Sequence, residues 1–294
     1  MTTKLKTLFS TLATGFLAAL ALVVLPAAAY ASTGPEIKYV GVTADRTDIE
    51  SLQRGARLFV NYCLNCHSAQ YMRYNRLTDL KLTEDQIRQN LMFTTDKIGD
   101  TMKVALNPRD AKEWFGAAPP DLSVMARSYT TEKLAAYLRG FYQDDARETG
   151  WNNMVSPNIG MPHVLHQLSG VNKLVETVYV ADGKELKTDH EAEAKAQAAF
   201  IAMQSMSSFE HHTDKKDGKV QSKYIVRTVA SVSPGILTPV EYDIAVADIV
   251  NFMDYVAEPN KAKRIQIGII MLFLLAFLLA AAIWLKKEFW KDIH

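Results

Sequence analysis

The segment Cys63-Leu-Asn-Cys-His67 restricts the chemistry of this sequence more than any other stretch. Two cysteines three positions apart, followed directly by a histidine, form the attachment signature of c-type haem. Cys63 and Cys66 would form thioether bonds to two vinyl groups on one porphyrin edge, and the His67 imidazole would bind the iron on its proximal side. The sequence therefore predicts one covalently bound haem c.

Two other classes of site use similar cysteines. A zinc ribbon needs a second pair of ligands with similar spacing, and the sequence contains only 2 cysteines. A thiol–disulfide oxidoreductase shares the Cys-x-x-Cys motif and is the main alternative. The histidine that follows Cys66 favours haem over a redox dithiol.

The N-terminal residues 1–31 have the pattern of a secretory signal peptide. They begin with Lys4 and Lys6, continue through the apolar run 15–25 and end in a small-x-small cleavage site, Ala-Tyr-Ala. An uncleaved anchor is the alternative, but the apolar run is short. Cleavage would place the rest of the chain in the bacterial periplasm, outside the cytoplasmic membrane, where c-type haem is attached.

A second apolar segment, residues 265–285, lies near the C-terminus. At ~1.5 Å per residue a helix of this length spans about 31 Å, which matches a hydrocarbon core of ~30 Å. A buried core helix is the alternative, but basic residues flank both ends of the segment. We therefore expect a basic linker at 261–264, a single transmembrane helix in the inner membrane, and a cytoplasmic tail at 286–294, with orientation fixed by the cleaved signal.

The exported part, residues 32–260, carries 25 basic and 30 acidic residues, a net charge of about −5. This charge gives no support to nucleic-acid binding, and it suits a basic protein partner.

Helical patterns dominate the exported part, so we expect a mainly α c-type cytochrome domain. Apolar residues at helical spacing run from Ile49 into Cys63, and Gly55 within this helix is expected to allow close approach of another helix. Further helices are indicated by the capping signals Thr83–Gln86, Asn107-Pro108 and Thr130 or Thr131, and by the apolar stripe of residues 242–257.

Residues 171–233 differ in character and are interpreted as an inserted α+β segment that covers one side of the haem domain. The alternating run 175–180 meets Asp182-Gly183, which predicts a hairpin. An alanine-rich helix is expected at 190–206, a solvated turn at 214–218 and a strand at 224–232.

The function depends on the face of the iron opposite the proximal histidine. A protein ligand there makes the haem an electron carrier, whereas an open face lets it bind or activate small molecules. Met161 lies in the irregular stretch Pro157–Pro162, where Gly160 allows close backbone approach. His163 and His166 are alternatives, because histidine is the commoner metal ligand. The loop context favours Met161, and His/Met ligation would raise the reduction potential relative to His/His.

Several motifs in order resemble one family. The chain resembles bacterial cytochrome c1 in six features that occur in the same order. These are the signal peptide, the early Cys-Leu-Asn-Cys-His, Gly-Ala-Ala-Pro-Pro-Asp-Leu-Ser at 116–123, Ile-Gly-Met-Pro around Met161, Leu-Thr-Pro-Val-Glu-Tyr-Asp at 237–243 and one C-terminal anchor. This is the haem subunit of the quinol:cytochrome c reductase (cytochrome bc) complex. The resemblance spans the chain from residue 50 onward.

The resemblance implies roles for particular residues. Cys63 and Cys66 would hold the haem, with His67 and Met161 as axial ligands. Pro119 and Pro120 would pack at the haem edge. Arg127 matches a basic residue of the family, while Tyr129 stands where many relatives have a second arginine that contacts a haem propionate. The insertion also departs from the shorter mitochondrial pattern.

The resemblance further implies outer-sphere electron transfer from a Rieske iron–sulfur protein, through this chain, to an accepting cytochrome c. The quinol chemistry would belong to a cytochrome b subunit, and this chain would make or break no substrate bond. A free-standing anchored electron carrier and a haem sensor or peroxidase with an open distal site are the alternatives.

Overall fold

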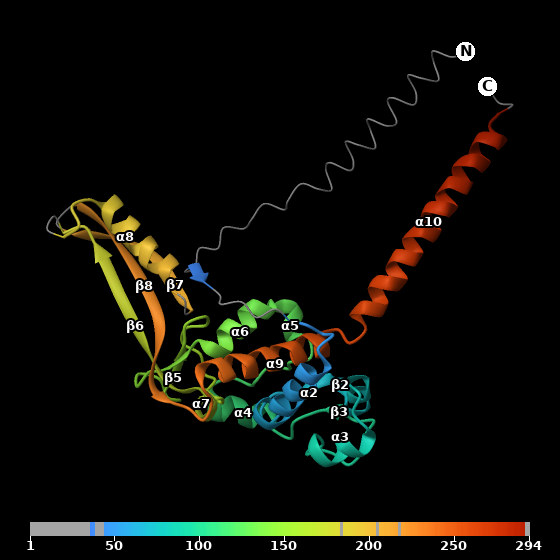
Figure 1. The fold of residues 1–294 in the computed structure, drawn as a ribbon, viewed down its shortest axis with the longest axis horizontal. Coiled ribbons are helices and arrows are strands. Elements are labelled where there is room, and N and C mark those ends of the chain that lie inside the picture. The colour runs from blue at the N-terminus through green and yellow to red at the C-terminus, as the bar shows by residue number, and fades with distance from the viewer. Residues whose placement is uncertain (1–35, 39–43, 183–184, 204–205, 217–218, 292–294) are drawn as a thin grey trace. The chain divides into compact units, whose positions relative to one another are not determined.

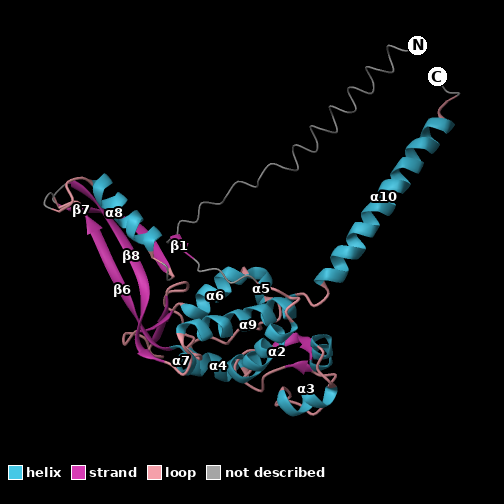
Figure 2. Cartoon of the chain, viewed as in Figure 1, coloured by secondary structure: helices cyan, strands magenta, loops and turns pink. Residues whose placement is uncertain are grey.

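The computed structural model describes residues 36–38, 44–182, 185–203, 206–216 and 219–291. The predicted signal peptide lies outside these residues. Of the described residues about 48% are helical and 20% are in strands, so the expectation of a mainly α fold holds only in part. Figure 2 shows that the long strands gather in one sheet, while helices form the part that carries the Cys-x-x-Cys-His motif.

Two helices far apart in the sequence form the centre of the domain (Figure 1). The helix α2 (Ile49–Leu58) begins at Asp48, whose side chain accepts a hydrogen bond from the Ser51 amide. The helix α9 (Pro239–Ala257) begins with a capping box between Thr238 and Glu241. Its predicted apolar stripe is buried, as expected for a helix packed against a core.

Gly55 allows these two helices to touch. A Cβ atom built at Gly55 would lie 2.0 Å from the carbonyl oxygen of Asp248 on α9, so only glycine fits this crossing. Around it, the buried Asp248 carboxylate accepts hydrogen bonds from Ser51 Oγ at 2.7 Å and from Arg54 Nε at 2.7 Å. The predicted close approach at Gly55 is confirmed.

The chain changes pitch just before the motif. The π-helix η1 (Phe59–Cys63) follows α2 directly, and the Leu64 amide donates to the Phe59 carbonyl oxygen, five residues back. The Cys66 and His67 amides then both donate to the Cys63 carbonyl oxygen, at 3.1 and 2.9 Å. This tight turn places both cysteines and the histidine on one side of the helix end.

Short elements complete the helical part. Three predicted capping signals are confirmed, and they start α3 (Glu84–Asn90), α4 (Pro108–Phe115) and α6 (Thr131–Arg139). The remaining elements here are the 3₁₀ segment η2 (Tyr74–Leu80), the short helices α5 (Met125–Ser128) and α7 (His166–Ser169), and the strand pairs β2 (Ala69–Arg73) with β3 (Thr101–Met102) and β4 (Phe141–Gln143) with β5 (Trp151–Asn153).

The insertion supplies three strands of a four-stranded sheet with strand order β1-β7-β8-β6, and β1 joins them from before the haem motif. The strands of the sheet are β1 (Glu36–Lys38), β6 (Gly170–Val180), β7 (Ser207–Lys216) and β8 (Lys219–Pro234), all antiparallel to their neighbours. Helix α8 (Asp189–Ala202) packs on the sheet through a small core of its own, with Ala192, Ala196 and Phe200 against Tyr224 and Val226.

The predicted hairpin at Asp182-Gly183 is wrong. The strand β6 pairs with β8, and the next element described after it is α8, so no strand among the described residues returns directly after residue 182. The tight pairing lies instead between β7 and β8, where Lys216 is opposite Lys219. Residues 214–216 of the predicted solvated turn are therefore part of the strand β7.

A long apolar helix follows the domain. Only three residues separate the end of α9 from the helix α10 (Lys261–Phe289), so residues 261–264, expected as a basic linker, belong to the helix itself. Lys263–Phe289 is long and apolar enough to cross a membrane, and none of it is buried within the protein. It is a candidate membrane anchor.

Candidate functional site

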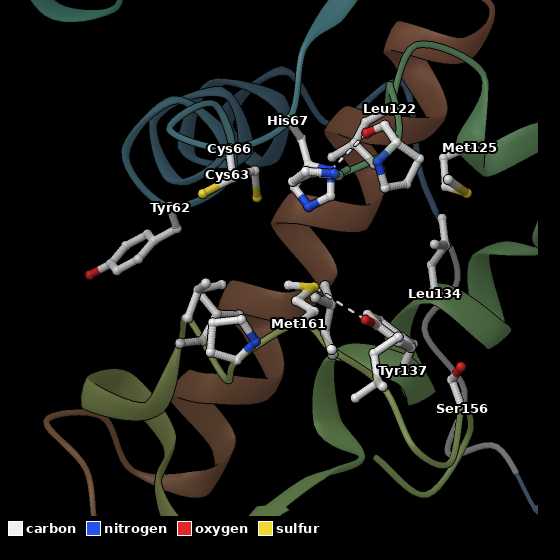
Figure 3. Close-up of a pocket in the computed structure, with 18 of the residues that line it drawn as sticks. Tyr62, Cys63, Cys66, His67, Leu122, Met125, Leu134, Tyr137, Ser156 and Met161 are labelled. Carbon is white, nitrogen blue, oxygen red and sulfur yellow. Dashed lines mark hydrogen bonds between the residues drawn. The ribbon is translucent and has the colours of Figure 1, made fainter. Parts of the chain in front are cut away.

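An apolar cavity of about 390 Å³ lies beside the Cys-x-x-Cys-His motif. Cys63, Cys66 and His67 line one side of it, and Met161 lines the other (Figure 3). Helix α9 contributes Ile249 and Met253 to the wall, and the loop after α4 contributes small residues and prolines. The cavity therefore collects side chains from segments that are far apart in the sequence.

His67 is fixed in one tautomer. Its Nδ1 lies 2.7 Å from the Pro120 carbonyl oxygen, and because a carbonyl oxygen only accepts, Nδ1 must carry the proton. Burial lowers the pKa of His67, although the Pro120 hydrogen bond and the Asp121 charge oppose this. The neutral ring thus has a free electron pair on Nε2, and a histidine needs such a pair to bind a metal.

Both cysteines of the motif line the cavity wall. Burial raises the pKa of Cys63 to about 12. The reactive cysteine of a thiol–disulfide oxidoreductase needs the opposite shift, because the thiolate is the nucleophile. The surroundings of Cys63 therefore do not suit dithiol exchange.

Met161 faces the cavity opposite His67 (Figure 3). Its Sδ accepts a hydrogen bond of 3.1 Å from the Tyr137 hydroxyl group of α6. Close backbone approach at Gly160 is also present, since a Cβ atom there would lie 3.1 Å from the Phe115 carbonyl oxygen. A thioether and an imidazole thus approach the same space from opposite sides.

The loop that carries Met161 is held by two buried asparagines of β5 that the sequence analysis did not identify. Asn153 Oδ1 accepts from the Val155 and Ser156 amides at 2.9 and 3.2 Å. Asn152 Oδ1 accepts from the Asn158 amide at 2.8 Å, and Asn158 itself has a left-handed backbone with φ 64°. An Asn-Asn pair before an irregular Pro/Gly stretch is the signal that could have indicated this role.

The two alternative histidines lie elsewhere. His163 is buried, stacks on the Phe141 ring at 4.9 Å and shares a hydrogen bond of 2.8 Å between its Nε2 and Ser169 Oγ. His166 is exposed at the start of α7. Neither lines the cavity, so of the three ligand candidates only Met161 does.

Some of the other predicted pocket residues line the cavity, and one does not. Pro119 and Pro120 line the cavity, and Pro120 also orients His67. Arg127 is exposed on α5 and is not among the lining residues, whereas Tyr129 is. The structure therefore gives no support to Arg127 as a pocket residue, because the short α5 turns it toward solvent.

The donor set fits the haem that the motif implies. The cavity offers two thiols at haem-attachment spacing and two different axial donors, nitrogen and sulfur, on opposite sides of an apolar space. Among the described residues, no group of three or more histidine, cysteine, aspartate or glutamate side chains is placed to hold a metal ion directly.

Sequence comparison with known proteins points to one family. The sequence profile of the cytochrome C1 family matches residues 40–232 and 237–293. A protein of Allochromatium vinosum named cytochrome c1 is 39% identical over 93% of this chain and 96% of its own length. A protein of Nitrosomonas europaea named ammonia monooxygenase gamma subunit is 40% identical over 94% of this chain and 97% of its own length. A cytochrome c1 of Rhodospirillum rubrum is 22% identical over 84% of both chains. The chain belongs to the cytochrome c1 family.

Proposed function

We propose that this chain relays single electrons from a Rieske iron–sulfur protein to an accepting cytochrome c within a quinol:cytochrome c reductase. Membership of the family supports the coarser statement, a c-type cytochrome that carries electrons in a bc1-type complex. The observation that carries the proposal is that Met161 and His67 face one cavity from opposite sides.

In this proposal Cys63 and Cys66 hold one haem c through thioether bonds, and His67 and Met161 are its axial ligands. The bound haem supplies one-electron exchange between ferric and ferrous iron. The protein supplies an apolar cavity, which disfavours the more highly charged ferric state, and a thioether, which raises the potential further.

The surroundings of the cavity suit passage of an electron and not of a substrate. In this proposal His67 and Met161 would both bind the iron, so no position would be left for a small molecule to bind it. The monooxygenase name of the Nitrosomonas europaea relative therefore does not lead us to propose oxygen chemistry at this site. In our proposal the quinol chemistry belongs to a cytochrome b subunit.

The proposal places the cavity outside the cytoplasmic membrane. The candidate span in α10 would anchor the domain in the inner membrane beside cytochrome b, with the C-terminus in the cytoplasm. The net charge of about −5 on residues 32–260 supports docking of a basic cytochrome c. The electron donor, a Rieske protein, would dock close to the part of the cavity wall that Pro119 and Pro120 line.

The ligand assignment is tested by Met161→Leu in the protein purified with its complex. The haem should stay attached through the cysteines, while the reduction potential falls sharply and carbon monoxide binds the ferrous protein. Met154→Leu is the matched control, because Met154 does not line the cavity and packs in a separate cluster with Ala136 and Met206. An unchanged potential in Met161→Leu would refute the assignment.

The assembly is tested separately. The detergent-solubilised protein should purify with cytochrome b and Rieske subunits and show quinol:cytochrome c reductase activity. Purification as an isolated haem protein would instead favour a free-standing anchored carrier.

A further inference from the structure

Tyr137 touches the Met161 side chain at the sulfur atom itself. The distance from the Tyr137 hydroxyl oxygen to Met161 Sδ is 3.1 Å, and Figure 3 shows this contact pointing away from the His67 side of the cavity. A thioether sulfur has no proton and only accepts, so the hydroxyl group is the donor. The contact is therefore a directed hydrogen bond, and it is more specific than apolar packing.

The tyrosine is held in place from two sides. Its ring lies edge-on to Phe141, with centroids 5.2 Å apart, and the ring lines the cavity wall. Its backbone carbonyl oxygen accepts a hydrogen bond of 2.8 Å from Asn153 Nδ2. Asn153 also accepts hydrogen bonds from the Val155 and Ser156 amides. Tyr137 is therefore connected to the Met161 loop twice, through its own hydroxyl group and, by way of Asn153, through its own backbone.

We infer that Tyr137 is a positioning residue for Met161: its hydroxyl group occupies one sulfur lone pair, leaves the other toward the cavity, and draws electron density from the sulfur. The inference rests on the proposed role of Met161 as an axial ligand. A sulfur atom that donates less electron density stabilises the ferric state less, while the ferrous state is affected less strongly. The hydrogen bond should therefore raise the reduction potential beyond the value that an unbonded methionine would give.

The test is Tyr137→Phe in the full-length haem protein, which removes one oxygen atom and keeps the ring on Phe141. The reduction potential should fall by ~30 mV. For a one-electron couple this is an about threefold change in the ratio of ferric to ferrous protein, which is within the range of one neutral hydrogen bond. The near-infrared charge-transfer band of the ferric protein, which reports a sulfur ligand, should persist but shift. Tyr142→Phe, outside the cavity on β4, is the matched control and should change neither readout.

Comparison with Met161→Leu separates the two ideas. If that variant loses the band and the potential while Tyr137→Phe behaves like Tyr142→Phe, Met161 is the ligand but the hydroxyl group does not tune it, and the inference is refuted. If Met161→Leu keeps both, the ligand assignment itself fails. A lower potential and a shifted band in Tyr137→Phe alone among the tyrosine variants support the inference.

Discussion

Replacement of Gly55 by alanine sets two opposing effects against each other. In an isolated helix the change is favourable by about 1 kcal/mol, because alanine loses less backbone entropy than glycine. In this protein the new Cβ atom would lie 2.0 Å from the Asp248 carbonyl oxygen, 2.7 Å from its carbonyl carbon and 2.8 Å from Phe252 Cβ. None of these atoms can rotate away, since two are backbone atoms and the third is attached to the backbone.

The steric effect should prevail. Ordinary carbon–oxygen contacts begin near 3.3 Å, so α2 and α9 must separate by about 1 Å. Overpacking of this kind costs about 1–3 kcal/mol, and the backbone contacts place Gly55→Ala at the upper end. After subtraction of the helix-propensity gain, we expect a net loss of about 2 kcal/mol, which corresponds to a fall in Tm of ~4–8 °C.

Thermal unfolding of the detergent-solubilised haem protein, followed by far-ultraviolet circular dichroism, measures this change. Gly99→Ala is the matched control, because no heavy atom lies within 4 Å of its added Cβ and its φ is outside the left-handed region. It should change the stability by no more than ~0.5 kcal/mol. A Tm for Gly55→Ala equal to or above that of the unmodified protein would show that the helices are not in contact here.

Three further changes test other parts of the structure. Asn153→Ala removes three hydrogen bonds from a fully buried site, so we expect a loss of stability of about 1–3 kcal/mol and faster proteolysis of the Met161 loop, measured by limited digestion. The hydrogen bond from Asn152 holds the pKa of Asp144 below its usual range. The ionised Asp144 carboxylate therefore stabilises the fold above about pH 4, and this contribution is lost as the pH falls through the lowered pKa of the folded state. Asn152→Ala should therefore flatten the acid limb of a plot of Tm against pH; an unchanged slope would exclude this linkage. Ala196→Leu overpacks the separate core of the insertion and should lower the stability by about 1–3 kcal/mol while the haem spectrum stays unchanged.

Local signals in the sequence were sufficient for much of the helical part. Capping residues such as Thr83 and Asn107 determine where a helix begins through their own side chains, and each appears in the structure where the pattern placed it. The glycine at position 55 was equally informative, because a residue that weakens a helix is expected only where something must approach closely.

The insertion was predicted less well, because strand pairing depends on distant partners. Asp182-Gly183 has the composition of a hairpin turn, but the partner of β6 is β8, on the far side of α8 in the chain. Nothing local distinguishes these two outcomes. The strand β1 joins β7 from the other end of the sequence, a pairing that no pattern within Glu36–Lys38 could indicate.

The same distinction applies to the site. The cavity brings together Met161 and the motif at Cys63–His67, and both were predicted from their local sequence. Arg127 was assigned by resemblance and lies away from the cavity, since four residues of α5 decide its direction. Tyr137 belongs to the helix that the capping signal at Thr130 or Thr131 predicts. Its hydroxyl bond to Met161 depends on how α6 meets a loop more than twenty residues later, which periodicity does not reveal.

The three residues between α9 and α10 set the length of a tether. Residues 258–260 cannot extend beyond about 14 Å even when fully stretched. Glu258 shortens the usable length further, because it forms an ion pair with Arg264 in the first turn of α10. If α10 enters a bilayer, the end of α9 stays close to the membrane surface, and α9 itself forms part of the cavity wall. The cavity then stays at a nearly constant distance from the membrane surface. A protein that exchanges electrons with the site must therefore itself move between this site and its own partner.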